Sequence, residues 1–162
     1  MKWLFFVFLI STPLLASCNT PKGRYQSAVI EDSAGGLCFK IEDTKEARRK
    51  NPAISGVGIG EQHSDHFEEI WLVLFPPAGI PEPVVSPDVC IPYEKVKSLP
   101  KLQPHKAYIL SITGSLDGVA RFYSAKFCMI EQNGDLRVQQ VTFDSKRKLW
   151  NWDKCGIGYP VP

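Results

Sequence analysis

The densest group of side chains that could do chemistry lies between residues 63 and 69. Two histidines and three carboxylates fall within seven residues: His63, Asp65, His66, Glu68 and Glu69, with Ser64 among them. The spacing His63-x-x-His66 could bind a metal ion from a loop, because imidazole is a common metal ligand. A helical His-Glu-x-x-His motif and a third nearby histidine are missing. We therefore interpret the segment as a solvated loop before a strand, and predict no metal and no cofactor.

Nucleophile and phosphate-binding motifs are also missing from the sequence. No serine lies in a Gly-x-Ser-x-Gly motif, and no glycine pattern leads from a strand into a helix. Gly56, Gly58 and Gly60 alternate with Val57 and Ile59, which favours a flexible or edge strand over a phosphate loop. The sequence therefore predicts that the protein is not an enzyme and has no small-molecule substrate.

Four of the five cysteines form an even set that predicts two disulfides: Cys38, Cys90, Cys128 and Cys155. A zinc site is the competing interpretation, but there is no Cys-x-x-Cys pair and successive cysteines are 52, 38 and 27 residues apart. Three connectivities are open. We favour Cys38 with Cys90 and Cys128 with Cys155, because these pairs avoid the longest loop closures.

The N-terminus has the pattern of a signal peptide. A basic residue, Lys2, precedes the apolar run Trp3 to Ile10, and small residues follow up to Ser17. A helix needs about 20 apolar residues to span a bilayer, and Pro13 interrupts this run earlier. Residues 1–17 are therefore expected to be removed from the mature chain.

The end of this segment, Leu15-Ala16-Ser17-Cys18, resembles the lipobox of bacterial lipoproteins. In such proteins the cysteine is acylated and becomes the first mature residue, which would account for the fifth cysteine of the chain. Two or three acyl chains anchor a protein stably, whereas one anchors it marginally. By the same resemblance, Asn19 implies sorting to the outer membrane. We expect a periplasmic protein held at the membrane by its N-terminal lipid.

Length and charge set the number of domains and exclude one class of partner. The chain has 162 residues and a formal net charge of +2, with no long block of basic residues. It therefore lacks the basic face that nucleic-acid binding requires. Residues 18–26 are polar and are expected to form a lipidated tether. Residues 27–162 are long enough for a single β-rich periplasmic domain.

Strand signals dominate that domain. Segments rich in Val, Ile, Phe and Tyr are separated by turn residues, and Asn133-Gly134 predicts a hairpin. The segments are 28–31, 37–41, 69–75, 107–113, 120–130 and 136–143. The pattern predicts an all-β fold, namely a small β-sandwich of the immunoglobulin-like type, and a small open barrel is the alternative.

Helical signal is weak. Residues 43–50 could form about two turns, but Ala47 is their only apolar residue, so this helix should dock weakly on the core. Residues 94–99 could form one more turn. Six prolines between Pro76 and Pro92 exclude a central strand there, which predicts an ordered crossing or an edge.

Aromatic and basic residues gather near the C-terminus. Arg147, Trp150 and Trp152 lie within six residues, and Trp and Arg are frequent anchors of protein interfaces. These three residues are the candidate partner interface. In the alternative, which the sequence favours, one Trp covers the core beside Cys155 while the basic residues face water.

Four segments after the lipobox carry a family resemblance: Gly36 to Ile41 (GLCFKI), Asp88 to Tyr93 (DVCIPY), His105 to Leu110 (HKAYIL) and Phe122 to Cys128 (FYSAKFC). In their order and spacing they are similar to the type VI secretion system (T6SS) immunity periplasmic lipoproteins. The resemblance covers roughly residues 1–130. The charged segment 43–65 and the tail 144–162 are additions to the family pattern.

The resemblance implies that this protein binds a toxin delivered into the periplasm and neutralises it by occlusion. A disulfide-stabilised, anchored scaffold with an interface and no active site suits that task. The alternative function is that of a structural or assembly-accessory lipoprotein in a cell-envelope or secretion complex. The expected partner is accordingly a protein toxin or a component of such a complex.

Overall fold

The structure is a computed structural model that describes residues 24–34, 36–76, 82–93 and 96–157. The predicted signal peptide and the predicted lipidation site, Cys18, lie outside these residues. None of the described helices has the length and apolar composition that crossing a bilayer requires.

Strands make up most of the described chain, so the predicted all-β fold is confirmed. The strands are β1 Tyr25–Ser33, β2 Gly36–Ile41, β3 Ala53–Gln62, β4 Phe67–Leu74, β5 Ala107–Leu116, β6 Val119–Gln132, β7 Asp135–Gln140, β8 Thr142–Asp144 and β9 Leu149–Asn151. The helical elements are α1, Lys45–Lys50, and the short 3-10 helix η1, Asp153–Cys155.

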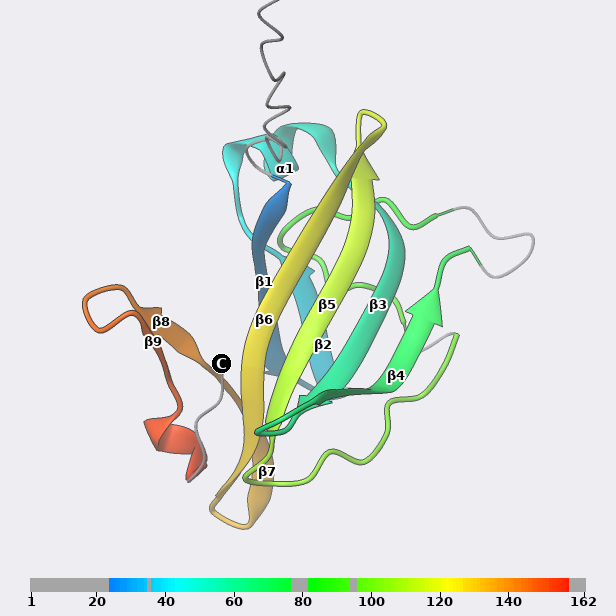
Figure 1. The fold of residues 1–162 in the computed structure, drawn as a ribbon. Helices are drawn as coiled ribbons and strands as arrows, with labels where there is room; N and C mark the ends of the chain where they lie inside the picture. The colour runs from blue at the N-terminus through cyan, green and yellow to red at the C-terminus, as the bar shows by residue number, and fades with distance from the viewer. Residues whose placement is uncertain (1–23, 35, 77–81, 94–95, 158–162) are drawn as a thin grey trace, which may run out of the picture.

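Seven strands form one curled sheet in the order β2-β1-β6-β5-β3-β4, and β7 also pairs with β6. β1 runs parallel to β6 through Tyr25–Ser27, then leaves it and pairs antiparallel with β2 from Ala28 onward. This departure carries the β1–β2 hairpin behind β6 and β5 (Figure 1). One curled sheet is closer to the open-barrel alternative than to a sandwich, and the immunoglobulin-like arrangement is not confirmed.

The core lies between the β1–β2 hairpin and the inner face of the sheet. On β5, Tyr108, Leu110 and Ile112 are fully buried, as their alternation predicts. Phe39 and Ile41 of β2 belong to the same apolar cluster. Full burial of such a side chain contributes about 1.5–3 kcal/mol, so this packing holds the hairpin against the sheet.

Residues 82–93, the described part of the proline-rich segment after β4, cross the open side of the curled sheet, which is one of the two predicted alternatives. The Ile91 amide donates to the Phe39 carbonyl oxygen. The Tyr93 ring stacks on Phe39 with 4.7 Å between ring centroids, and the Tyr93 hydroxyl donates to the Leu37 carbonyl oxygen at 2.6 Å. Cys90 is bonded to Cys38. Residues 82–93 therefore close the core without forming a central strand.

The prediction of a flexible or edge strand around Gly56, Gly58 and Gly60 is wrong. These glycines lie in β3, which is a central strand between β4 and β5. Val57 and Ile59 point into the core and are almost fully buried. Side chains from neighbouring strands cover the glycines, so tertiary packing compensates for the weak strand preference of glycine.

Helix α1 docks more firmly than its composition predicts. Thr44 caps it by accepting a hydrogen bond from the Ala47 amide at 3.0 Å. Ala47 is its only buried residue, as expected, but Glu46 also pairs with Arg121 of β6 at 3.0 Å, and the Arg121 side chain is largely buried. Of the predicted turn at 94–99, the described residues show the amides of Val96 and Lys97 bonded to the Tyr93 carbonyl oxygen.

The folded domain begins slightly earlier than predicted. Tyr25 and Gln26, expected in the tether, belong to β1. The Phe122 amide donates to the Arg24 carbonyl oxygen at 2.8 Å, and the Tyr25 ring packs edge-on against Phe122. Pairing with β6 therefore orders residues whose local sequence is polar.

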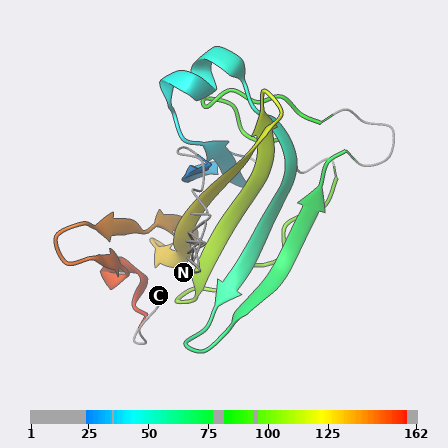
Figure 2. The ribbon, with the colours of Figure 1, turned by 45° about the horizontal axis from the view of Figure 1, so that its top comes forward.

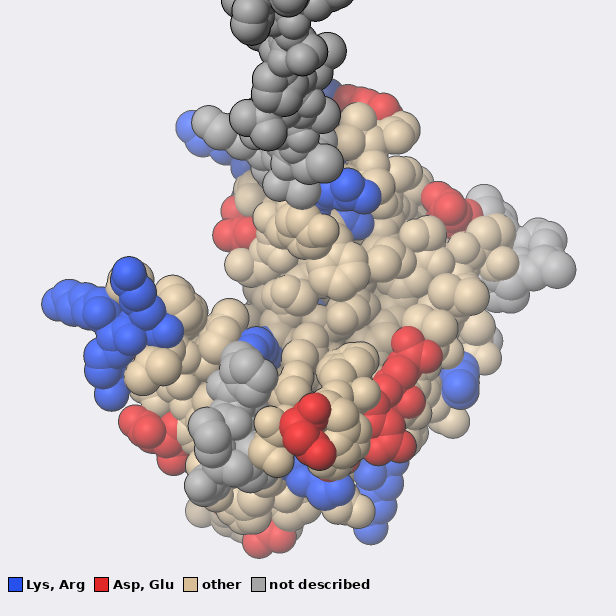
Figure 3. All heavy atoms as spheres, in the orientation of Figure 1, with Lys and Arg blue, Asp and Glu red and all other residues tan. Residues whose placement is uncertain are grey.

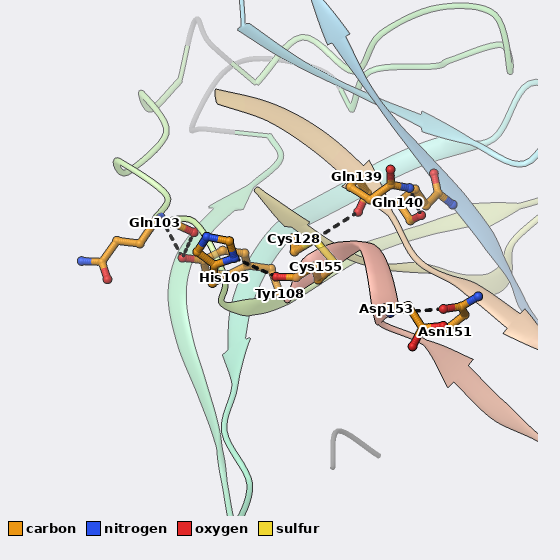
Figure 4. The surroundings of a disulfide bond; sticks show 9 residues. All are labelled: Gln103, His105, Tyr108, Cys128, Gln139, Gln140, Asn151, Asp153 and Cys155. Carbon is orange, nitrogen blue, oxygen red and sulfur yellow. Dashed lines mark hydrogen bonds between the residues drawn. A yellow bond between two sulfur atoms is a disulfide. The ribbon is translucent and has the colours of Figure 1, made fainter. Parts of the chain in front are cut away.

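Strands β8 and β9 and helix η1 form a small C-terminal unit beside the main sheet (Figures 1 and 2). A second apolar cluster packs it against β5 and β6; its members are Ala107, Cys128, Val141, Trp152 and Cys155. The Cys128–Cys155 disulfide joins the unit to β6. His105 Nδ1 lies 2.9 Å from the Cys155 carbonyl oxygen and adds a second connection (Figure 4).

Candidate partner interface

The four cysteines of the folded domain are paired as the favoured connectivity predicts. Cys38 is bonded to Cys90 and Cys128 to Cys155. The cysteine zinc site is thereby excluded, because a disulfide sulfur is not the thiolate that a metal binds. Both bridges join elements that lie far apart in the sequence, and their role is structural.

The structure separates the three residues predicted to form the partner interface. Trp152 is buried beside Cys155 in the C-terminal unit, which corrects its assignment as an interface residue. Trp150 is half-buried, with Phe143 5.3 Å away between ring centroids and Lys126 Nζ 4.8 Å from its ring. Arg147 is exposed, but its Nε donates to Asp144 Oδ2 at 2.7 Å. The favoured alternative, in which one Trp covers the core, is correct for Trp152.

A larger apolar surface lies on the side of the sheet away from the core, which we call the outer face. One row across five strands consists of the paired positions Tyr25, Phe122, Thr113, Gly56 and Leu74. The ends of this row are bulky and apolar, and its middle is small. Leu74 and Tyr25 are 63% and 65% exposed, so the apolar ends of the row are available to another molecule.

The next row has still smaller side chains at its centre. It consists of the paired positions Ser27, Ser124, Ser111, Gly58 and Leu72. Serine and glycine occupy most of the row, so no bulky side chain rises from its centre. The two rows together form a shallow trough whose floor consists mainly of small residues.

A hollow of about 250 Å³ follows this trough. Its floor includes Gly56, Gly58 and Gly60, and its walls include Phe67 and Leu72 from one side and Phe122 from the other. Protruding apolar side chains of a partner could enter such a hollow and pack against aromatic and aliphatic walls. Concave, mostly apolar surfaces with few polar groups are typical of binding sites.

Charged side chains border the trough without entering its centre. A broad area without Lys, Arg, Asp or Glu extends over the middle of β6, β5 and β3, and acidic side chains gather over the lower part of β4 (Figure 3). Glu69 lines the hollow and has no ion-pair partner within the described part of the chain. The face therefore complements an apolar surface that carries a basic group.

No family model, curated protein or solved structure matches this chain. The assignment of the outer face therefore depends on its geometry. Sequence reasoning missed it, although a signal was present. The strand 70–75 is apolar at successive positions, so Trp71 and Val73 face the core while Leu72 and Leu74 face outward. A strand that is apolar on both faces is typical of strands that are covered on both sides.

A second hollow, of about 430 Å³, lies beside the β6–β7 hairpin and offers no comparable site. Both carboxylate oxygens of Asp32 accept a hydrogen bond from the Val138 amide at 3.3 Å. Arg137 lies 3.5 Å from Asp135. The charged side chains that line this hollow are thus engaged with neighbouring groups, and the lining includes no nucleophile positioned by a base.

Two side chains around the C-terminal unit, Asp144 and Lys126, have pKa values shifted from their usual range. The hydrogen bond from Arg147 holds the pKa of the Asp144 carboxyl below its usual range, and the amides of Arg147 and Lys146 add to the effect. Burial beside Trp150 lowers the pKa of the Lys126 ammonium. Both groups have structural roles, because they fix the turn between β8 and β9 and the packing of Trp150.

Residues 63–66 form the turn between β3 and β4, whereas residues 67–69, which were predicted to belong to the loop, are already part of β4. The His63 amide donates to the His66 carbonyl oxygen at 2.9 Å and closes the turn. The turn is largely exposed, as predicted, but the two histidine rings lie face to face with 4.3 Å between their centroids. The sequence did not predict this contact.

Proposed function

We propose that the protein is a lipid-anchored periplasmic immunity protein that binds a secreted toxin of the T6SS type and neutralises it by occlusion. The class of function comes from the sequence resemblance. The observation that supports a binding role is the exposed apolar trough on the outer face, with its floor of small residues and its walls at Phe67, Leu72 and Phe122.

The occupant that suits this trough is a folded protein with protruding apolar side chains. A stable interface buries about 1,600 Å² in total and derives most of its affinity from a few central anchors. Leu72, Leu74 and Phe122 could meet such anchors. A lysine or arginine of the toxin would lie opposite Glu69, because that carboxylate borders the trough without a partner in the described chain.

Occlusion needs affinity rather than chemistry. Association energy would come from removing the apolar walls from water, at about 25 cal/mol per Å² before the costs of association are subtracted. The two disulfides would keep the scaffold rigid during binding. The predicted lipid would confine it to the compartment that the toxin enters.

The experiment that tests this proposal uses two matched leucines. Leu74 on the outer face is 63% exposed, and Leu149 of the C-terminal unit is 60% exposed. A strain that lacks the gene is complemented with the full chain, with Leu74→Asp or with Leu149→Asp, and is competed against its toxin-armed parent. We expect the deletion strain to lose, and protection to be restored by the full chain and by Leu149→Asp but not by Leu74→Asp.

Each other outcome points elsewhere. Loss of protection only with Leu149→Asp would place the interface at the C-terminal unit, near Arg147 and Trp150. A deletion strain that competes equally well, with its secretion system shown to be active, would reject the immunity function and favour the envelope-accessory alternative. Thermal unfolding of both variants checks that neither aspartate unfolds the chain.

A further inference from the structure

The turn between β3 and β4 brings metal-binding side chains together. One ligand atom each from His63, His66 and Glu68 lies within 4.8 Å of the others. Glu61 is close as well, since its Oε1 is 3.5 Å from His63 Nε2. Two imidazoles and two carboxylates therefore lie close together at this turn. Glu61 and Glu68 are paired across the hairpin, and the two histidines lie between them in sequence.

His63 is only partly satisfied in this arrangement. Its Nε2 is shielded from solvent and makes no hydrogen bond. The nearest acceptors, Glu61 Oε1 and Glu68 Oε2, are 3.5 and 3.7 Å away, which is beyond a good hydrogen bond. A buried nitrogen without a partner is costly, and this one is directed towards two carboxylates.

His66 is oriented as metal-binding histidines usually are. Its Nδ1 lies 2.7 Å from Asp65 Oδ1, which leaves Nε2 for a ligand. Metal-binding histidines commonly use one ring nitrogen for the metal and the other for a carboxylate or carbonyl oxygen. Glu61 is held in turn by Lys106 Nζ at 2.8 Å. The Asp65 carboxylate therefore already orients one of the three ligands.

We propose that this cluster binds a divalent transition-metal ion, with Zn²⁺ as the best fit. His63, His66 and Glu68 would supply three ligands, and water or Glu61 the fourth. Two imidazoles with carboxylate oxygen match the preference of Zn²⁺, whereas Mg²⁺ and Ca²⁺ prefer oxygen ligands alone. Tetrahedral Zn²⁺ needs its ligand atoms roughly 3.3 Å apart. The side chains of His66 and Glu68 are exposed, so they can move until their ligand atoms reach that separation.

The ion would act on the neighbouring surface through Phe67. Phe67 lies between two of the ligands in sequence, and its ring covers Gly60 at one end of the outer-face trough. Fixing His66 and Glu68 would restrict the backbone on both sides of Phe67. The metal site itself is independent of the proposed function, because its binding can be measured without any toxin.

The test uses the purified full chain, first treated with a chelator. Zn²⁺ is titrated in competition with a chromophoric chelator, and Co²⁺ is used as a spectroscopic substitute whose visible absorption reports tetrahedral coordination. We expect one ion per chain. Binding should be lost in His63→Ala and in His66→Ala, and weakened about 10- to 100-fold in Asp65→Asn, which alters only the carboxylate behind His66.

Glu69→Gln is the matched control, because it removes the same charge from the same strand as Glu68→Gln but lies outside the cluster. It should retain Zn²⁺ binding, whereas Glu68→Gln should lose it. Cys18→Ser should also retain it, which excludes binding by the fifth thiol. Circular dichroism of each variant in chelator checks that it is folded, and Glu68→Gln keeps the test decisive if a histidine variant does not fold.

Three results would overturn the site. The first is a wild-type chain that does not bind Zn²⁺. The second is a loss smaller than tenfold in a folded His63→Ala, His66→Ala or Glu68→Gln variant. The third is a stoichiometry of one ion per two chains, which would place the ion between molecules instead of within one hairpin.

Discussion

The ring of Phe67 occupies the space that a side chain on Gly60 would need. A Cβ atom built on Gly60 would lie 1.9 Å from Phe67 Cζ. Gly114 is equally crowded, but there the nearest atom is the Ala53 carbonyl oxygen, at 2.3 Å. The two glycines therefore face different obstacles: an exposed side chain that can rotate and a strand backbone that cannot.

This difference predicts opposite responses to alanine. Gly60→Ala should displace the Phe67 ring into solvent and change the free energy of unfolding by less than about 1 kcal/mol, since alanine also suits a strand better than glycine. Gly114→Ala should cost about 1–3 kcal/mol, as overpacking against a fixed neighbour does. Urea denaturation measures both. Equal losses in the two variants would show that Phe67 is fixed in place.

Asp144 should titrate below the usual range of an aspartate. Its pKa is lowered chiefly by the hydrogen bond from Arg147, so the stabilisation it gives the turn is present above about pH 3.9 and is lost as the pH falls through the lowered value. In Arg147→Ala the midpoint should rise towards the ordinary value. NMR detection of the Asp144 carboxyl during an acid titration measures this, and an unchanged midpoint would mean that the backbone amides alone cause the shift.

The two disulfides should differ in what their removal unfolds. Replacing Cys128 and Cys155 with serine should release the C-terminal unit and leave the main sheet folded, because the unit has a separate apolar cluster. Hydrogen exchange should accelerate in residues 142–151 and remain slow in β5. If β5 lost its protection to the same extent, the two clusters would be one cooperative unit.

Replacing Cys38 and Cys90 with serine should instead destabilise the whole sheet. This bridge fastens the proline-rich crossing to β2, and both contribute to the main core. For the 52-residue separation, loop entropy gives an upper figure of about 4 kcal/mol. Chemical denaturation under non-reducing conditions measures the loss, and a change below about 1 kcal/mol would show that packing alone holds the crossing.

Lipidation of Cys18 is a prediction from the sequence and has a direct test. Cys18→Ala should leave an unprocessed or soluble periplasmic form, because acylation is the membrane attachment that the sequence predicts. Fractionation of cells after labelling with radioactive palmitate measures both location and acylation. Label on the alanine variant would contradict the lipobox assignment.

Local patterns predicted the parts of the fold that depend on neighbours in sequence. Tyr108, Leu110 and Ile112 lie at alternate positions of the predicted strand 107–113 and all point into the core. Asn133 and Gly134 of the predicted hairpin both adopt positive φ angles, 55° and 85°, as a tight hairpin requires. The parallel pairing of Tyr25 with Phe122 joins strands almost a hundred residues apart. No local pattern encodes that pairing, so the way the sheet curls could not be predicted.

The candidate site was less predictable for a related reason. Outward-facing Leu72 and Leu74 resemble core residues in sequence, and only the pairing of β4 with glycine-rich β3 shows that they wall a trough. Trp150 and Trp152 are two residues apart and chemically equivalent in sequence. Their different burial depends on the chain turning into η1 directly after Trp152.

The edge-on contact between Tyr25 and Phe122 sets how far the outer face can stand from a bilayer. Tyr25 follows Cys18 by seven positions, and a fully extended chain of seven residues spans at most roughly 25 Å. If Cys18 carries the lipid, the tether joins the domain at Tyr25, which is one end of the outer-face row; Leu74 is the other end. A partner on that face would then be captured within a few nanometres of the membrane surface, so membrane proximity would limit the size and approach direction of the molecules that can dock there.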